Sequence, residues 1–144
     1  MTTKRWLFKA TVRRWVDGDT VIFRDIDLGF NTHVHDESCR LLGIDTAETR
    51  GGTLELKQLG KFATEYVREA CPAGSKVWIE TELDTGKFGR TLARVYHEGL
   101  DMPALNERLI EDRLAISYDG GSREEAAEQH MQNYMYHSEA GSFD

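Results

Sequence analysis

The sequence predicts an α+β fold, mainly β, in which five short strands form a small, partly open barrel of the OB architecture with three helices. Three observations predict this class. Three strand-like segments open the chain, a long segment with helical spacing follows, and two more strands precede two further helices. Because 144 residues suffice for one core and not for two, we expect a single domain over residues 1–144, with its core at about 8–137.

A tight-turn signal predicts the first strands, which we expect to be antiparallel. Residues 7–16 alternate loosely and carry β-branched and aromatic side chains, and a second such run at 21–23 follows Asp17-Gly18. Asp-Gly between two strand-like runs indicates a hairpin, because glycine accepts the positive φ of the turn. Residues 25–36 are expected to form a longer turn, after which residues 38–44 return as the third strand.

Spacing and breakers predict the later elements. Apolar residues recur at helical spacing over 54–70, behind Thr53 as a candidate N-cap and before Pro72, which ends the helix. The remaining expected elements are strands at 76–82 and 91–97, a short helix at 102–113, and a polar helix from 123 to about 137.

The net charge of −7 excludes a protein coated with basic side chains for nucleic-acid binding, but leaves room for an enzyme with a small basic site. No stretch is long and apolar enough to cross a membrane, and the first ten residues lack a secretory apolar region. We therefore expect an intracellular, cytoplasmic monomer without membrane contact. A phage or another mobile element is one candidate source.

The most informative stretch is residues 40–48, Arg-Leu-Leu-Gly-Ile-Asp-Thr-Ala-Glu, in which charges enclose an apolar run. The run at 41–44 is typical of a buried strand, so Arg40, Asp45 and Glu48 are expected on a stiff element. Charges held in this way are costly unless they face a ligand, a metal or each other. The stretch therefore predicts a functional site.

The chemistry of this site follows from its oxygen donors and cations. Asp19 follows the hairpin turn and can meet Asp45 if the first three strands are neighbours. Two carboxylates with a carbonyl and water form a hard-oxygen site suited to Ca²⁺ or Mg²⁺. Arginines such as Arg40 and Arg90 match phosphate oxygens, and Glu48 is placed to orient or deprotonate a water. Together these groups predict hydrolysis of a phosphate ester.

Four motifs in order resemble the staphylococcal (micrococcal) nuclease family of thermonuclease-like domains, from about Phe8 to about His137. They are Val-Asp-Gly-Asp-Thr-Val at 16–21, Arg-Leu-Leu-Gly-Ile-Asp-Thr-Ala-Glu-Thr at 40–49, Lys-Phe-Gly-Arg-Thr-Leu-Ala at 87–93, and Leu-Asn-Glu-Arg-Leu at 105–109 with Leu-Ala-Ile-Ser-Tyr at 114–118. The resemblance implies a staphylococcal nuclease-like barrel and a largely nonspecific nuclease. Its substrate would be DNA, with RNA as a second candidate, cut to leave 3′-phosphate ends. Because a nucleotide must enter the site for the metal to reach its phosphate, we expect single-stranded or locally opened substrate to be preferred.

The resemblance also implies the metal ligands. Carried over by position, Asp19 and Asp45 would hold a Ca²⁺ ion together with the Thr46 carbonyl, and Asp17 would stand behind these ligands. Mg²⁺ and Mn²⁺ are weaker candidates for the ion. At position 47, where the family often has proline after the Asp-Thr pair, this chain has alanine.

The same resemblance implies the groups that act on the substrate. Glu48 would be the general base, and Arg40 and Arg90 would hold the scissile phosphate. The residues implied to contact a terminal phosphate and a base are Lys87, Phe88 and Tyr118. Phe88 stands where the family has a tyrosine, so stacking is kept but the hydroxyl is lost.

Simpler interpretations of single residues stay open. Asp17 can be a plain turn residue, Arg40 a structural partner of Glu48, and Tyr118 a partly buried aromatic side chain. Histidine spacing predicts no metal site, and His130 and His137 are expected on the surface of the last helix.

Two interpretations of the whole chain compete with the nuclease. One is a non-catalytic OB-type module that binds nucleic acid or protein, and the other is an interaction protein within a larger assembly. The complete ionic set of the motifs favours the enzyme, since a binding module needs no such set.

Overall fold

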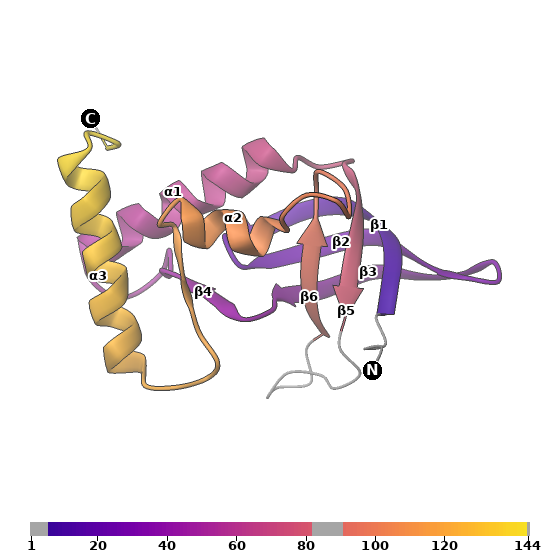
Figure 1. Ribbon diagram of the computed structural model, residues 1–144, viewed down its shortest axis with the longest axis horizontal. Helices are drawn as coiled ribbons and strands as arrows, with labels where there is room; N and C mark the ends of the chain where they lie inside the picture. The colour runs from indigo at the N-terminus through magenta and orange to yellow at the C-terminus, as the bar shows by residue number, and fades with distance from the viewer. Residues whose placement is uncertain (1–5, 82–90, 144) are drawn as a thin grey trace.

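The computed structural model describes residues 6–81 and 91–143, and their strands form a closed barrel in the order β1-β2-β3-β6-β5. The barrel strands are β1 (Trp6–Asp17), β2 (Thr20–Gly29), β3 (Thr32–Leu41), β5 (Lys76–Thr81) and β6 (Thr91–Tyr96) (Figure 1). The prediction of a five-stranded barrel with three helices is confirmed. The barrel is closed rather than partly open, and β3 pairs with β6 in parallel, whereas the other neighbouring barrel strands are antiparallel.

The long turn expected at 25–36 is wrong, because both strands run through it. β2 continues to Gly29 and β3 begins at Thr32, so only Phe30 and Asn31 form the turn, with φ of 53° and 62°. A two-residue turn with both φ positive matches the twist of the flanking strands. The resulting hairpin projects from the barrel beyond its packed part (Figure 1).

The strand expected at 38–44 is interrupted at Leu42-Gly43, where Gly43 has φ of 77°. After this turn the chain forms β4 (Ile44–Thr46), which leaves the barrel and pairs with β7 (Ala115–Ser117) in a separate two-stranded sheet. Asp45 therefore lies on this small sheet rather than at the end of a barrel strand.

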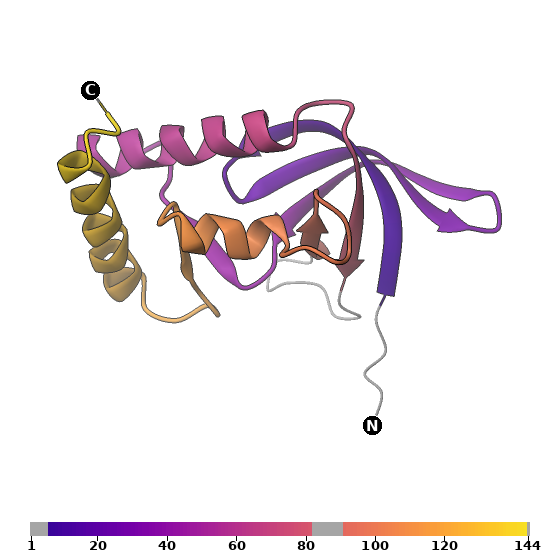
Figure 2. The ribbon, with the colours of Figure 1, turned by 45° about the horizontal axis from the view of Figure 1, so that its top comes forward.

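Three helices accompany the two sheets in the described part of the chain. Figure 2 shows that α1 runs from the barrel to α3, which crosses the end of α1 that lies away from the barrel. The helix α1 (Leu54–Ala70) begins as predicted at Thr53, whose hydroxyl accepts a hydrogen bond from the Leu56 amide at 3.2 Å. The helix α2 (Leu105–Glu111) is shorter than the expected 102–113. No helix among the described residues is long and apolar enough to span a membrane.

Gly60 allows α1 to approach the segment that follows β4 closely. A Cβ atom at this position would lie 2.5 Å from the Ala47 carbonyl oxygen and 3.0 Å from the Glu48 carbonyl group. The absence of a side chain thus lets the helix backbone press against the segment that carries Glu48.

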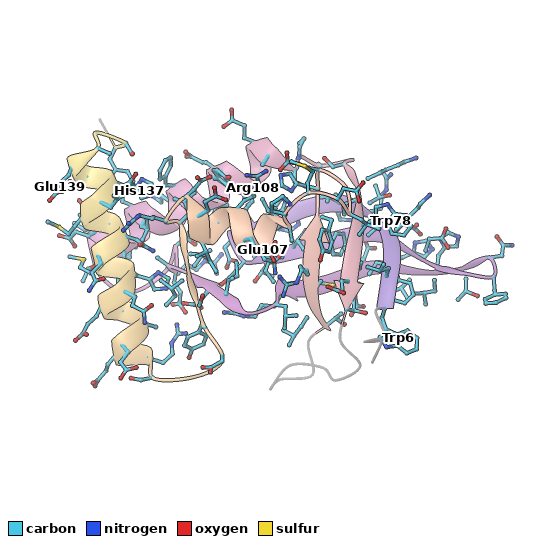
Figure 3. The ribbon with its side chains drawn as sticks, in the orientation of Figure 1. Trp6, Trp78, Glu107, Arg108, His137 and Glu139 are labelled. Carbon is cyan, nitrogen blue, oxygen red and sulfur yellow. The ribbon has the colours of Figure 1, made fainter. Side chains whose placement is uncertain are left out.

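The last helix, α3 (Arg123–Glu139), has a buried face made of Ala126, His130 and His137. The expectation that both histidines lie on the surface is wrong, because they are only 4% and 7% exposed. The His137 Nε2 atom lies 3.0 Å from the Asp112 carbonyl oxygen and 3.1 Å from that of Arg113. Figure 3 shows His137 on the side of α3 that faces the body of the protein and Glu139 on the opposite side. These contacts fasten α3 to the end of α2.

Candidate active site

Asp19 lies in the turn between β1 and β2 and is almost completely buried, with 4% exposure. Its Oδ2 accepts a hydrogen bond from the Thr46 amide at 3.1 Å, and its Oδ1 accepts one from the Thr20 hydroxyl at 3.2 Å. Its carbonyl oxygen also accepts from the Leu41 amide at 2.8 Å. The turn, β3 and β4 are thus tied together around one carboxylate.

Asp45 lies on β4 and is held from two sides. Its Oδ1 accepts a hydrogen bond from Nη2 of Arg40 at 2.8 Å, and its Oδ2 lies 2.8 Å from Nε2 of His130 on α3. Burial alone would raise the pKa of Asp45, but the hydrogen bonds from His130 and Arg40 outweigh it and hold that pKa below its ordinary value. Asp45 is therefore an ionised carboxylate at neutral pH.

Arg40 lies between the carboxylates of Asp19 and Asp45, and the sequence motifs predicted that these three residues share one site. The same Nη2 atom that bonds Asp45 lies 3.3 Å from Oδ2 of Asp19. Burial would lower the pKa of Arg40, but Asp19 and Asp45 raise it above its ordinary value. The guanidinium side chain remains 23% exposed, so part of its surface is open to a ligand.

Asp17 stands beside this group, and its Oδ1 accepts a long hydrogen bond of 3.4 Å from the Asp19 amide. Burial raises the pKa of Asp17 to about 7, and the neighbouring Asp19 carboxylate adds to the shift. The raised pKa thus follows first from burial at this end of the barrel and second from the neighbouring Asp19 carboxylate.

Glu48 follows β4 and points into solvent, with 74% of its side chain exposed. Its ion-pair partner among the described residues is Arg123, whose Nη2 lies 3.7 Å from Oε1 of Glu48. Nη1 of Arg123 lies 3.6 Å from Oδ1 of Asp45. Among the described residues Arg40 pairs with Asp19 and Asp45, not with Glu48, so the expected structural pair of Arg40 with Glu48 is not formed.

Tyr118 lies directly after β7 and is anchored at both ends. Its amide donates to the Gly43 carbonyl at 2.9 Å, and its hydroxyl donates to the Gly121 carbonyl at 2.9 Å. The Arg123 guanidinium lies over its ring at 5.2 Å from the centroid. One face of Tyr118 is therefore covered by Arg123. Three other predicted site residues lie outside the described residues: Lys87, Phe88 and Arg90.

Sequence reasoning missed two groups, Arg123 and His130, which α3 brings to the carboxylates. The sequence signal for His130 was its spacing, because Ala126, His130 and His137 recur on one helix face. This face is polar and therefore resembles a solvated one. A pocket of about 110 Å³ lies between α3 and the segment after β4, and Asp45, Glu48, Arg123 and His130 contribute to its walls.

Comparison with known proteins shows to which family the chain is similar. A model of the staphylococcal nuclease homologue family matches residues 38–141, more than two thirds of the chain. The thermonuclease of Staphylococcus intermedius is 31% identical over 105 residues, covering 72% of this chain and 56% of the relative. The thermonuclease of Staphylococcus hyicus is 30% identical over 105 residues, with the same coverage of both chains.

A third relative bears on the predicted location. An uncharacterized lipoprotein of Mycoplasma genitalium is 35% identical over 96 residues, covering 62% of this chain and 35% of the relative. The chain thus spans between about a third and just over half of the length of these relatives. Because one of them is a lipoprotein by name, the prediction of an intracellular, cytoplasmic protein is contradicted.

The family match begins at residue 38, so it does not include Asp19, and the bonds of Asp19 to Thr46 and Thr20 show its place beside Asp45. On the matched residues and the barrel that carries them, this chain belongs to the staphylococcal nuclease homologue family.

Proposed function

We propose that this protein is a calcium-dependent, largely nonspecific nuclease that hydrolyses phosphodiester bonds of DNA, with RNA as a second substrate. The observation that carries the proposal is the convergence of two buried carboxylates, Asp19 and Asp45, on one guanidinium nitrogen of Arg40. Family membership and the two thermonuclease relatives support the same activity.

The donor chemistry fits a hard divalent cation. Asp19 and Asp45 supply the carboxylate oxygens, and Oδ1 of Asp19 and Oδ2 of Asp45 each keep a lone pair beyond the single hydrogen bond that orients them. The described residues contain no cluster of three His, Cys, Asp or Glu side chains able to hold a metal, so we assign further ligands to the Thr46 carbonyl and to water. Ca²⁺ tolerates such a mixed, irregular oxygen set better than Mg²⁺, which demands near-ideal octahedral geometry.

Each nearby side chain has a proposed part in the reaction. The cation, when bound, would neutralise charge on the phosphate. Glu48 orients or deprotonates the attacking water, since it is an exposed carboxylate beside Asp45 and Arg123. Arg40 binds the scissile phosphate with the open part of its guanidinium. The Asp17 carboxylate supports Asp19 by accepting a hydrogen bond from the Asp19 amide.

The bond changes follow from these parts. The water oxygen attacks phosphorus, its proton leaves to Glu48, and the bond from phosphorus to the 5′-oxygen breaks. The leaving 5′-oxygen takes up a proton, and the other product carries a 3′-phosphate. Arg90 is proposed as the second arginine on the phosphate, with Lys87, Phe88 and Tyr118 as contacts for a neighbouring phosphate and base.

Contacts of this kind read the backbone and the π-face of a base, so we expect little sequence preference. A nucleotide must leave the duplex to reach the buried carboxylates, which favours single-stranded or locally opened substrate. The negative charge of the whole chain adds to this preference, because duplex DNA presents the higher charge density.

The test is cleavage of denatured DNA in Ca²⁺, Mg²⁺, Mn²⁺ or chelator, by the wild-type protein beside Glu48→Ser. Glu124→Ser is the matched control, because Glu124 is also exposed and lies next to Arg123. We expect cleavage that requires Ca²⁺, leaves ends sensitive to a 3′-phosphatase, and falls at least 100-fold in Glu48→Ser alone. A protein that binds single strands but cleaves them under none of these conditions would be a binding module instead.

A further inference from the structure

Asp45 and Asp19 share an unusual degree of fixation, since each carboxylate is held at both of its oxygens. Asp19 is held by the Thr20 hydroxyl on β2 at 3.2 Å and by the Thr46 amide on β4 at 3.1 Å. Arg40 and His130 hold Asp45, each at 2.8 Å. Three of these four groups come from strands β2 to β4, whereas His130 comes from α3, 85 residues after Asp45.

The hydrogen bond between His130 and Asp45 has a defined direction. An ionised carboxylate can only accept, so Nε2 of His130 carries the hydrogen and donates it to Oδ2 of Asp45. The other ring nitrogen, Nδ1, is buried and has no hydrogen-bond partner among the described residues. A buried, unpartnered nitrogen is unfavourable for folding, so packing alone does not explain a histidine here.

We infer that His130 is a positioning residue, which orients the Asp45 carboxylate for the cation and so makes α3 part of the calcium site. This inference rests on the proposed function. With Oδ1 turned toward Arg40 and Oδ2 toward His130, the carboxylate cannot rotate about its last bond, and its remaining lone pairs keep one direction. Partners of metal-binding carboxylates typically contribute 10- to 100-fold to metal affinity.

The other buried histidine of α3 provides a matched control. His137 is also on the inner face of the helix, but its Nε2 contacts the carbonyl oxygens of Asp112 and Arg113 rather than a site residue. A substitution there removes a buried histidine and weakens the docking of α3 without touching Asp45. His137 therefore separates loss of helix docking from loss of carboxylate orientation.

The test is calorimetric titration with Ca²⁺ in the absence of nucleic acid, on the wild-type protein, His130→Gln, His130→Asn and His137→Gln. The glutamine amide nitrogen can stand where Nε2 of His130 lies, whereas the shorter asparagine cannot reach Asp45. Urea unfolding of each variant reports stability separately, and all titrations use conditions in which the variants are folded.

We expect His130→Asn to weaken Ca²⁺ binding 10- to 100-fold, with His130→Gln and His137→Gln staying within about threefold of the wild type. Equal Ca²⁺ affinity in His130→Asn and the wild type would overturn the inference, and so would equal losses in His130→Asn and His130→Gln. A wild-type protein that binds no Ca²⁺ would instead overturn the proposed calcium site itself.

Discussion

The Thr46 amide donates a hydrogen bond of 3.1 Å to the Asp19 carboxylate, and this bond joins the β1–β2 hairpin of the barrel to the separate β4–β7 sheet. The carboxylate of Asp19 is thereby aligned by the strand that carries Asp45. Neither sheet contains the whole site. The relative placement of the two sheets consequently decides whether the two carboxylates can share one ligand.

The first prediction concerns the ionisation of Asp17. Its pKa in the folded protein is about 7, above the ordinary value of 3.8, so the folded state binds a proton that the unfolded chain has released between about pH 4 and pH 7. The resulting stability is complete below pH 4 and is lost as the pH rises through about 7. Asp17→Asn should therefore gain stability relative to wild type by about 1–2 kcal/mol from pH 5 to pH 8, allowing for partial solvent screening.

Urea unfolding of metal-free protein at pH 5, 6, 7 and 8 measures this difference. Asp101→Asn, at an exposed carboxylate, is the control and should show no such trend. A constant difference between Asp17→Asn and wild type over this range would show that Asp17 is already ionised at pH 5.

A second prediction follows from the contact of α1 with the segment that carries Glu48. Helix propensity alone would make Gly60→Ala stabilising by about 1 kcal/mol. The added Cβ would, however, lie 2.5 Å from the Ala47 carbonyl oxygen, so the backbone must move. We expect a net loss of about 2 kcal/mol in the free energy of unfolding, and a loss of cleavage rate that exceeds the loss of folded protein.

Lys61→Ala tests the helix itself, because this neighbouring residue is exposed on α1. Urea unfolding and single-turnover cleavage of both variants separate the two effects. Stabilisation by Gly60→Ala with a normal cleavage rate would contradict the close packing described for this position.

A third prediction concerns the buried amide of Asn106 on α2. Its Oδ1 accepts from the Val95 amide at 3.0 Å, and its Nδ2 donates to the carbonyl oxygens of Leu42 and Ala93 at 2.9 and 3.2 Å. Asn106→Leu leaves these backbone groups buried without a partner and should cost about 3 kcal/mol in the free energy of unfolding. Urea unfolding measures the loss, and Ca²⁺ affinity of the remaining folded protein should change little. A loss below 1 kcal/mol would mean that water replaces the amide.

A fourth prediction concerns the planar fork of Arg40. Lysine at this position keeps a positive charge near Asp19 and Asp45 but cannot present two parallel donors to a phosphate. We expect Arg40→Lys to lower single-turnover cleavage of denatured DNA in saturating Ca²⁺ by about 100-fold, with the fold retained. Arg24→Lys, at an exposed arginine, should cleave normally. An unchanged rate in Arg40→Lys would make Arg40 a purely structural partner of the carboxylates.

The sequence predicts the barrel well where a strand has one buried and one exposed face, because alternation then records the packing. It fails at residues 25–36, because the projecting hairpin has little buried face to impose a pattern. It also fails at Leu42-Gly43, because a continuous apolar run hides a turn between two buried segments. The local motifs identified Asp19, Arg40 and Asp45 as neighbours in one site.

The contribution of α3 could not be predicted in the same way. Its inner face consists of alanine, histidine and amide side chains, which a hydropathy pattern assigns to solvent. The partners of His130 and Arg123 are Asp45 and Glu48, which lie far away in the chain. Only the folded arrangement shows that these polar groups are buried against one another or face the same pocket.

The 85 residues between Asp45 and His130 also fix an order of events during synthesis. A nascent chain that ends before residue 123 already contains the five barrel strands, both carboxylates and Arg40. It lacks α3 and therefore the hydrogen bond from His130 to Asp45. Closing so long a loop is entropically costly, so this contact is expected to form late. On the proposed roles, the growing chain gains full cutting ability only after α3 has been made. This ability is also the first property lost when α3 detaches from a barrel that remains folded.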